Sequence, residues 1–440
     1  MPTTPVVTVI GGGMAGCEAA WQLAKRGVCV RLYEMRPVKQ TPVHKTDALA
    51  EMVCSNSLRS DGLDNAVGLL HEEMRRLDSL FLSSADNNRV PAGKALAVDR
   101  SRFSREITER LAAVSEVEIV RGELTEIPKG PCIIATGPLT SEALSQDICK
   151  LTGSEHLYFY DAISPIVLAD TIDTNKTFAA SRYDKGGADY INCPFTQQEF
   201  DRFYTELMQA ETDELPDFER KLFFEGCLPI EEIGRRGPET LLYGPMKPVG
   251  LTDPRSNERP HAVAQLRQDD IAAEHYSLVG FQTRLKWGPQ EKVLRLIPGL
   301  EKAEFVRFGT VHRNTYINAP RMLSETLQTR TRGDLYFAGQ IAGTEGYVES
   351  AAGGLLAGIY CGMALLDGGI SPVPRTTALG SLAFYISHAR ALNYQPTNIT
   401  FGIIPVLEKP VRRKQERREA ISRRALRDLE SWIKSKTSAG

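Results

Sequence analysis

The sequence predicts an α/β fold in which one domain is interrupted by the insertion of another. Near the start of the chain, an apolar strand, a glycine turn, a helix and a second strand follow one another. A similar strand, glycine turn and helix return near residue 335. Because two units of this kind complete one sheet, the different residues between about 157 and 307 are expected to form a second α/β domain.

The first of these units has the pattern of a dinucleotide site. The apolar run "VVTVI" leads into "GGGMAG", a helical stretch "CEAAWQLAKRG" follows, and "VCVRLYE" ends on an acidic residue. The glycines let the backbone approach a pyrophosphate, the helix N-terminus offers free N–H groups, and the acid accepts a ribose hydroxyl. This Rossmann-like pattern predicts that the cofactor contacts Gly11, Gly12, Gly13, Met14, Ala15, Gly16 and Glu34.

Two later segments indicate FAD rather than NAD as the bound dinucleotide. "GPCIIATGP" is an apolar strand that ends in Ala-Thr-Gly, which is typical of flavoproteins of the glutathione-reductase type. "GDLYFAGQIAGTEGYVESAAGGLLAG" predicts a strand over Leu335–Ala338, a glycine turn and a helix of small residues from about Glu349. In such flavoproteins a late turn of this kind meets the pyrophosphate and ribityl chain, so Gly339 and Gln340 are further expected contacts.

Composition sets broad limits on the function. The formal net charge of −2 gives no general preference for nucleic acid, so any basic site must be local. No apolar run reaches membrane-spanning length, and the N-terminus lacks the pattern of a signal peptide. The eight cysteines form no C-x-x-C, which argues against disulfides and against a metal site. We therefore expect a cytoplasmic protein with reduced thiols, no metal and no membrane contact.

Longer segments resemble one family. "LAEMVCSNSLRSD", "VPAGKALAVDR", "RRGPETLLYGPMKPVGL" and "FAGQIAGTEGYVESAAGGLLAG" are similar to the folate- and FAD-dependent tRNA (uracil-5-)-methyltransferases, the TrmFO family. The resemblance implies that a methylene of 5,10-methylenetetrahydrofolate reaches carbon 5 of uridine 54 in the T-loop of the tRNA T-arm. It also implies that reduced FAD supplies the hydride and that NADH or NADPH re-reduces the flavin.

That reaction needs two thiols. A thiolate that adds to carbon 6 of uracil activates carbon 5, and a base must afterwards remove the carbon-5 proton. The resemblance implies that Cys227, in "GCLPIEEIGRRG", is the nucleophile and that Cys54, in "MVCSNSL", is the base. From the residues alone, the better explanation of either thiol is a buried, inert side chain, because free cysteines are usually of that kind. Cys193 is expected to be structural, and core positions are expected for Cys17, Cys29, Cys132, Cys149 and Cys361.

Two basic segments are candidates for contact with RNA. Arg235 and Arg236 follow Cys227, where they favour a thiolate and can hold phosphate. "KPVRRKQERREAISRR" carries eight Lys or Arg against two Glu. It contains Arg412, Arg413 and Arg417 and predicts either a helix on RNA phosphates or a solvated charged helix.

The expected domains are an FAD-binding domain of the glutathione-reductase type over 1–156 and 308–405, an inserted domain over 157–307 and a basic C-terminal helix over 406–440. Three alternative functions stay open. One is wobble-uridine modification of the kind performed by MnmG (GidA), a longer relative with a helical C-terminal domain. The second is methylation of a ribosomal RNA uridine. The third is a non-enzymatic tRNA-binding flavoprotein. The sequence predicts neither the oligomeric state nor the residues that bind folate.

Overall fold

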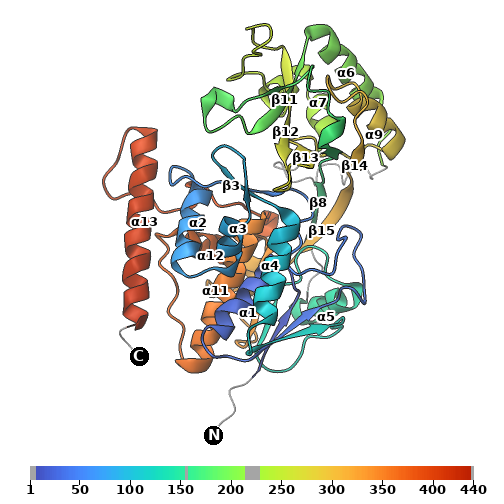
Figure 1. Ribbon diagram of the computed structural model, residues 1–440. Helices are drawn as coiled ribbons and strands as arrows, with labels where there is room; N and C mark the ends of the chain where they lie inside the picture. The colour runs from blue at the N-terminus through green and yellow to red at the C-terminus, as the bar shows by residue number, and fades with distance from the viewer. Residues whose placement is uncertain (1–5, 154–156, 214–227, 438–440) are drawn as a thin grey trace.

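The computed structural model describes residues 6–153, 157–213 and 228–437, which form a lower and an upper part in the view of Figure 1. Among these residues, the lower part is built on a five-stranded parallel sheet in the order β16-β7-β1-β2-β6. The late segment therefore completes the sheet begun by the first residues, which confirms the Rossmann-like fold. The strands are β1 (Val7–Ile10), β2 (Val30–Glu34), β6 (Val117–Arg121), β7 (Cys132–Ile134) and β16 (Leu335–Phe337).

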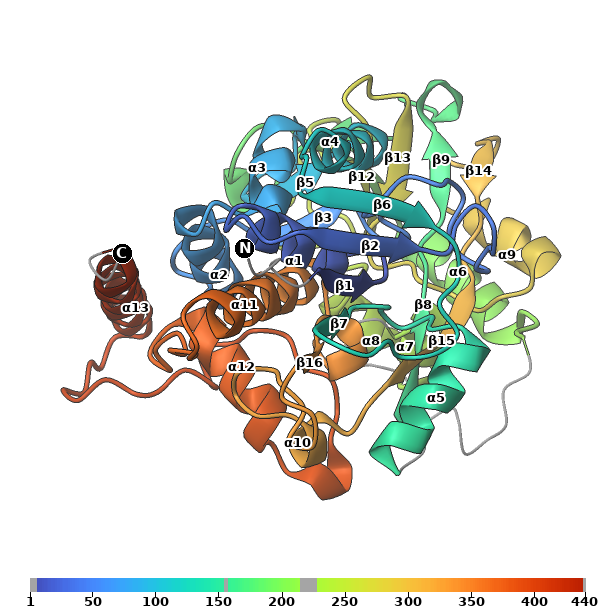
Figure 2. The same cartoon turned by 90° about the horizontal axis from the view of Figure 1, so that it is seen from below.

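Helices and a small second sheet surround this parallel sheet. A three-stranded antiparallel sheet has the order β3-β5-β4, and Figure 2 shows α1 and α11 side by side next to β1. The strands are β3 (Ser57–Ser60), β4 (Arg89–Val90) and β5 (Ala95–Val98). The helices are α1 (Met14–Ala24), α2 (Ala66–Arg76), α3 (Leu80–Asn87), α4 (Arg100–Ala112), α5 (Glu142–Thr152), α10 (Ala319–Met322), α11 (Tyr347–Leu366) and α12 (Ala378–His388).

Helices α1 and α11 pack backbone to backbone through small residues. A Cβ atom on Gly354 would lie 2.0 Å from the carbonyl oxygen of Ala15, and one on Gly358 would lie 2.6 Å from that of Ala19. Within the described residues, α11 is the one helix long and apolar enough to span a membrane, contrary to the expectation that no such run exists. It is almost wholly buried, and its apolar length is explained by this packing at the centre of the lower part.

The upper part holds a six-stranded antiparallel sheet in the described part of the chain, in the order β10-β11-β12-β13-β9-β14. Helix α6 begins with a capping box between Thr196 and Glu199. The strands are β9 (Ile166–Leu168), β10 (Phe178–Ala179), β11 (Tyr190–Phe195), β12 (Ala262–Gln268), β13 (His275–Leu278) and β14 (Phe305–Arg307). The helices are α6 (Gln197–Gln209), α7 (Ile230–Arg235), α8 (Pro238–Tyr243) and α9 (Trp287–Leu294).

The two parts have separate hydrophobic cores. One large cluster draws on residues before 149 and after 315, and a second lies between Val167 and Phe308. An antiparallel pair, β8 (Leu157–Ala162) and β15 (Val311–Tyr316), connects the parts (Figure 1). The domain boundaries after residues 156 and 307 stay a prediction, which the separate cores support.

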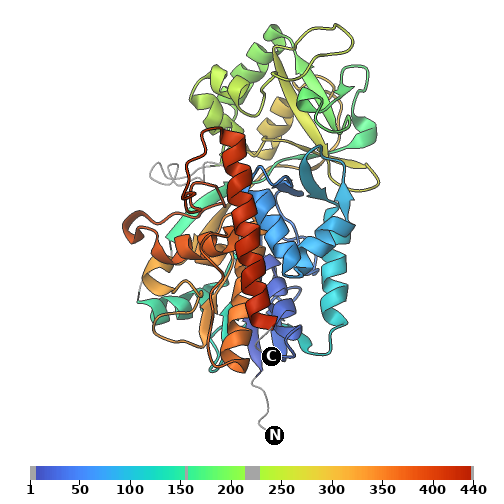
Figure 3. The same ribbon diagram turned by 90° about the vertical axis from the view of Figure 1, so that its left-hand side faces the viewer.

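The C-terminal helix α13 (Lys414–Thr437) begins later than the basic segment predicted. Figure 3 shows it running along the lower part. It buries Ile421, Ala425 and Leu429, and the opposite face keeps its charged side chains in solvent. Arg412 and Arg413 lie just before the helix rather than in it.

The close contact of α1 with α11 leads to a prediction. Gly354→Ala should lower the thermal unfolding midpoint, because its Cβ would collide with backbone and overpacking costs about 1–3 kcal/mol. Helix propensity alone acts in the opposite direction, by about 1 kcal/mol. The control is Gly369→Ala, where a Cβ meets nothing within 4 Å. A midpoint that rises in Gly354→Ala would contradict the backbone contact.

Candidate active site

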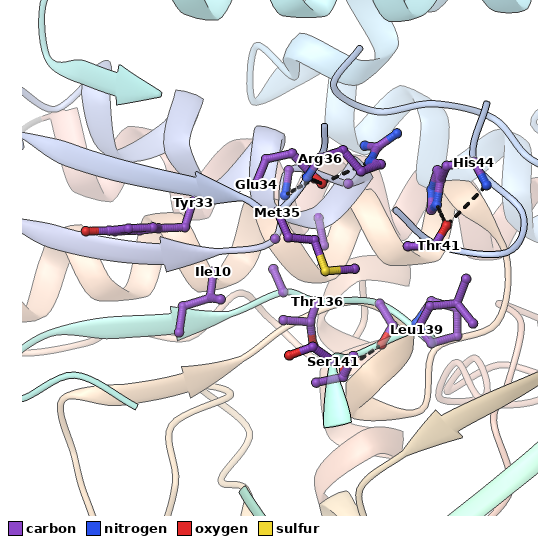
Figure 4. A pocket seen from close by; sticks show the side chains of 18 of the residues that line it. Ile10, Tyr33, Glu34, Met35, Arg36, Thr41, His44, Thr136, Leu139 and Ser141 are labelled. Atoms are coloured by element: carbon purple, nitrogen blue, oxygen red, sulfur yellow. Dashed lines mark hydrogen bonds and ion pairs between the residues drawn. The ribbon is translucent and has the colours of Figure 1, made fainter. Parts of the chain in front are cut away.

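A deep pocket opens at the carboxyl ends of β1, β2 and β7. Its enclosed volume is about 140 Å³, and this space continues into a wide mouth. Figure 4 shows Met35, after β2, facing Thr136, after β7, across this space. Of the predicted cofactor contacts, the pocket is lined by Gly11, Gly12, Gly13, Met14, Ala15, Glu34 and Gln340.

Gly16 and Gly339 do not line the pocket, but they allow the backbone segments around it to pack closely against one another. A Cβ on Gly16 would lie 1.8 Å from the carbonyl oxygen of Gly11. Gly339 has φ +77°, and a Cβ there would lie 2.7 Å from that of Ala15. Their role as direct cofactor contacts stays a prediction, and both also serve close packing, because a larger residue at either position would push the turn apart.

The turn into α1 suits a pyrophosphate. Gly11 has φ +106°, a conformation that favours glycine, and a Cβ there would lie 2.5 Å from the carbonyl oxygen of Ala135. Gly13 caps α1 without any side-chain hydrogen bond, and the first turn of the helix carries no acidic residue. The first helical turn therefore offers its N–H groups and the positive end of the helix dipole without an acidic residue of its own to compete.

Glu34 is fixed at the end of β2 by a residue that the motif did not indicate. Its Oε2 accepts a hydrogen bond from Gly12 N at 3.0 Å, and its Oε1 accepts from Arg36 N at 3.0 Å and Nε at 2.9 Å. Burial acts to raise the pKa of Glu34, but the hydrogen bonds and charge of Arg36 lower it overall. The carboxylate is therefore ionised, and it keeps acceptor capacity for a ribose hydroxyl.

Cys54 lies at the edge of this pocket, against Tyr347 at the start of α11. The Tyr347 hydroxyl oxygen accepts hydrogen bonds from Val53 N and Cys54 N, both at 2.8 Å, and lies 3.0 Å from Cys54 Sγ. With both lone pairs engaged, the hydroxyl proton is directed to the sulfur. Burial and the neighbouring thiol raise the pKa of Tyr347 well above 10, so the hydroxyl stays a neutral donor. A donor aimed at the sulfur favours the thiolate.

Three arginines add positive charge around Cys54. Arg100 donates to the Cys54 carbonyl at 3.2 Å and pairs with Asp269 at 2.9 Å. Arg267, buried on β12, donates to Ser55 Oγ at 2.8 Å. Burial is the main cause that lowers the pKa of Arg307 on β14. Its guanidinium also interacts electrostatically with Arg100, Tyr347 and Cys54. Arginines from both parts of the molecule therefore surround the loop that carries Cys54.

Tyr347, Arg36, Arg100, Arg267 and Arg307 were not predicted as site residues. Arg100 and Tyr347 lie inside segments that carried the family resemblance, so that resemblance was the one available signal for them. Arg307 lies in a further segment of that resemblance, "LKWGPQEKVLRLIPGLEKAEFVRFG", whereas Arg267 lies in a strand whose sequence shows no feature of a site.

Cys227, the predicted nucleophile, lies outside the described residues. After it, the short helix α7 is anchored through Glu231, whose carboxylate accepts from Thr283 Oγ1 at 2.8 Å and Arg284 N at 3.0 Å. Arg235 is exposed and pairs with Glu232 at 2.7 Å, and Arg236 is exposed as well. Both arginines are therefore at the surface, where a phosphate can reach them.

The remaining cysteines largely follow the expectation of structural roles. Cys193 is fully buried, and burial raises the pKa of its thiol well above the ordinary value. Cys29 is exposed, so its assignment to the core was wrong: it sits in the turn before β2 rather than in the strand. Cys149 is only half-buried on α5. The cysteines buried as expected are Cys17, Cys132 and Cys361.

The basic residues predicted near the C-terminus are all exposed. Arg413 pairs with Glu416 at 3.0 Å, and Arg412 and Arg417 extend from the same end of α13. In the described ranges, no group of three or more His, Cys, Asp or Glu side chains is placed to hold a metal ion.

Comparison with known proteins places the chain in a family. The family model described as "Glucose inhibited division protein A" matches residues 6–367. A relative from Bacillus cytotoxicus, named methylenetetrahydrofolate–tRNA-(uracil-5-)-methyltransferase TrmFO, is 57% identical over 433 residues, or 98% of this chain and 99% of its own. One of the same name from Anoxybacillus flavithermus is 56% identical over 428 residues, or 97% and 99% of the two chains. The chain belongs to the TrmFO family.

The solved structures agree on the fold. GidA from Aquifex aeolicus, in its form I crystal, superposes with a TM-score of 0.68 at 17% identity and covers 96% of this chain and 76% of its own. The form II crystal of that protein gives a TM-score of 0.66 at 16% identity, with 87% and 67% covered. TrmFO proteins and GidA thus share the two-part architecture, while this chain matches its TrmFO relatives over nearly their whole length.

The contact between Tyr347 and Cys54 leads to a second prediction. Tyr347→Phe removes the donor to the sulfur, so the pH at which Cys54 is half-alkylated by iodoacetamide should rise by about one unit or more. In the wild-type protein the raised pKa of Tyr347 keeps this donor protonated throughout the titration. Mass spectrometry of the Cys54 peptide measures the change.

A matched control is Tyr360→Phe, on the same helix, where the buried hydroxyl accepts from Val373 N at 3.0 Å. This variant should leave the alkylation of Cys54 unchanged. An unchanged midpoint in Tyr347→Phe would show that the tyrosine does not assist ionisation of the thiol.

Proposed function

We propose that this protein methylates carbon 5 of uridine 54 in the T-loop of tRNA, with 5,10-methylenetetrahydrofolate as the source of the methylene. The observation that carries the proposal is the 57% identity, over nearly the full length of both chains, to a relative named for methylenetetrahydrofolate-dependent tRNA uracil-5 methylation. The thiol of Cys54, held beside a dinucleotide-type pocket, supports the same chemistry.

The pocket fits FAD. The backbone of Gly11–Ala15 and the N-terminus of α1 would hold the pyrophosphate, and Glu34 would accept from the adenosine ribose. Gln340, Tyr347 and Ser350 line the same pocket from the late segment and would meet the flavin end. Reduced FAD supplies the hydride that converts methylene into methyl, and NADH or NADPH is the proposed source of its electrons.

The residues around Cys54 are suited to remove a proton. The Tyr347 hydroxyl and the arginine charges favour the thiolate, and a thiolate accepts the carbon-5 proton of the uridine. Cys227 is proposed to add to carbon 6, so that carbon 5 becomes nucleophilic. Arg235 and Arg236, which follow it, are proposed to hold RNA phosphates, and Arg412, Arg413 and Arg417 extend this contact. The protein is proposed to act in the cytoplasm.

The division of labour between the two thiols is tested with a T-arm RNA that carries 5-fluorouridine at the target position. Fluorine cannot leave as a proton does, so a carbon-6 thioether persists. Cys227→Ala should abolish the covalent complex. Cys54→Ala should keep the complex and lose methylation of the natural RNA. Peptide mapping by mass spectrometry identifies the attached cysteine.

The outcomes separate the alternatives. A complex that survives Cys227→Ala would remove the nucleophile assignment, and attachment at Cys54 would reverse the two roles. RNA binding without any adduct or methylation would favour a non-catalytic flavoprotein. Methylation of ribosomal RNA fragments but not of the T-arm RNA would identify ribosomal RNA as the substrate.

The proposed RNA contact at the start of α13 is tested by charge reversal. Arg412→Glu, Arg413→Glu and Arg417→Glu together should raise the Kd for tRNA. They should also reduce the slope of log Kd against log salt by roughly 0.7–0.9 for each phosphate that is no longer neutralised. Lys434→Glu with Lys436→Glu, at the other end of the helix, is the matched control. Equal effects of the two sets would indicate a general charge effect, and no effect would remove α13 from the RNA site.

A further inference from the structure

Trp287 is unusually exposed for a tryptophan. Its relative exposure is 72%, whereas Trp432 is buried and Trp21 is half-buried against α3 and α4. It begins α9, and its indole N–H has no hydrogen-bond partner among the described residues. The space beside it is open, because a Cβ on the next residue, Gly288, would meet nothing within 4 Å. An aromatic ring of this size left in water suggests a surface that binds something.

The exposed ring ends a ladder of nearly parallel aromatic side chains. Trp287 and Phe308 have centroids 6.2 Å apart and planes inclined by 23°. Phe308 and Phe305 are 5.8 Å apart and inclined by 28°. The two phenylalanines are half-buried against the core of the upper part, so their stacking holds the plane of the indole in place. Stacking uses one face of Trp287 and leaves the other to solvent.

This ladder connects to described residues around the 214–227 gap and to Arg307. Backbone hydrogen bonds join the segment just before Trp287 to the described residues on either side of the 214–227 gap, which contains Cys227. Lys286 N donates to Glu211 O at 3.0 Å, and Ile230 N donates to Gln282 O at 2.7 Å. The middle ring of the ladder, Phe308, directly follows Arg307, whose guanidinium interacts electrostatically with Cys54 and Tyr347. Figure 1 shows α9 and β14 side by side in the upper part, above β8 and β15.

We propose that the free face of Trp287 stacks an unpaired nucleobase of the RNA substrate, one next to the uridine that enters the Cys54 site. This inference rests on the proposed function. A nucleobase is a flat ring that continues a ladder of parallel rings, and stacking on aromatic side chains is how proteins hold single-stranded bases without reading their sequence. Lys286, the residue before Trp287, is exposed, and its ammonium can exchange its partner Glu211, at 3.2 Å, for the phosphate of the same nucleotide.

The first test is the RNA affinity of the holoenzyme. Trp287→Leu should weaken binding of a T-arm RNA about tenfold or more, whereas Trp287→Phe, which keeps a stacking face, should remain within about threefold of wild type. Tyr243→Leu is the matched control, because Tyr243 is 79% exposed in the same part but stacks on no described aromatic ring. Flavin content and the thermal midpoint of each variant establish that the fold is intact.

The second test identifies the base. Tryptophan fluorescence should be quenched on RNA binding in the wild type and not in Trp287→Phe. Abasic substitutions along the loop of the RNA should each weaken wild-type binding, but the one at the stacked nucleotide should have little further effect in Trp287→Leu. That non-additivity distinguishes stacking from a nonspecific weakening of the RNA-binding surface.

Three outcomes would overturn the inference: unchanged affinity in Trp287→Leu, equal losses in Trp287→Leu and Tyr243→Leu, or full additivity at every abasic position. In each case wild-type methylation of the same RNA shows that the proposed function stands without this platform. Failure of the wild-type protein to bind or methylate any T-arm RNA would instead remove the proposed function and this inference with it.

Discussion

The buried polar contact between the two parts of the molecule sets the geometry of everything at their junction. Arg267, on β12 of the upper part, donates through Nε to Asn56 Oδ1 at 2.9 Å, and Asn56 Nδ2 donates back to the Gln268 carbonyl at 2.9 Å. The Arg100–Asp269 ion pair lies beside it. Asn56 and Arg267 are buried, so breaking this contact would leave the Arg267 guanidinium and the Asn56 side-chain oxygen without these partners, which is costly. The upper part is therefore held in one orientation over the cofactor pocket.

The same contact also shapes the surroundings of Cys54. Asn56 is two residues from Cys54, so the groups that fix the orientation also fix the loop that carries the thiol. The arginines that hold the parts together are the ones whose charge favours a thiolate. The surroundings of Cys54 consequently come from both parts: the lower one supplies the Tyr347 hydroxyl, and the upper one supplies Arg267 and Arg307. A change in the orientation of the upper part would alter the ionisation of Cys54 as well as access to it.

A structural feature can be predicted from the sequence when the residues that determine it lie close together in the chain. The turn from Gly11 to Gly16 and the acid at Glu34 were predicted because glycine conformation and strand–helix spacing are determined within a short segment. Arg267 could not be predicted, since its partner Asn56 is 211 residues away. Cys29 was misplaced because an alternating apolar pattern does not locate the first residue of a strand. The roles of the thiols came from family resemblance, and Cys227 lies outside the described residues.

The late arrival of β16 and α11 has a consequence for how this protein is made. The floor of the cofactor pocket cannot close until residues beyond 335 have left the ribosome, after the whole upper part has been synthesised. At synthesis rates of about 5–20 residues per second, the turn at Gly11 and the inner face of α1 wait roughly 15–60 s for the helix that covers them. During that interval the nascent chain exposes the apolar surface that α11 later buries, so its need for chaperone protection should be greatest then.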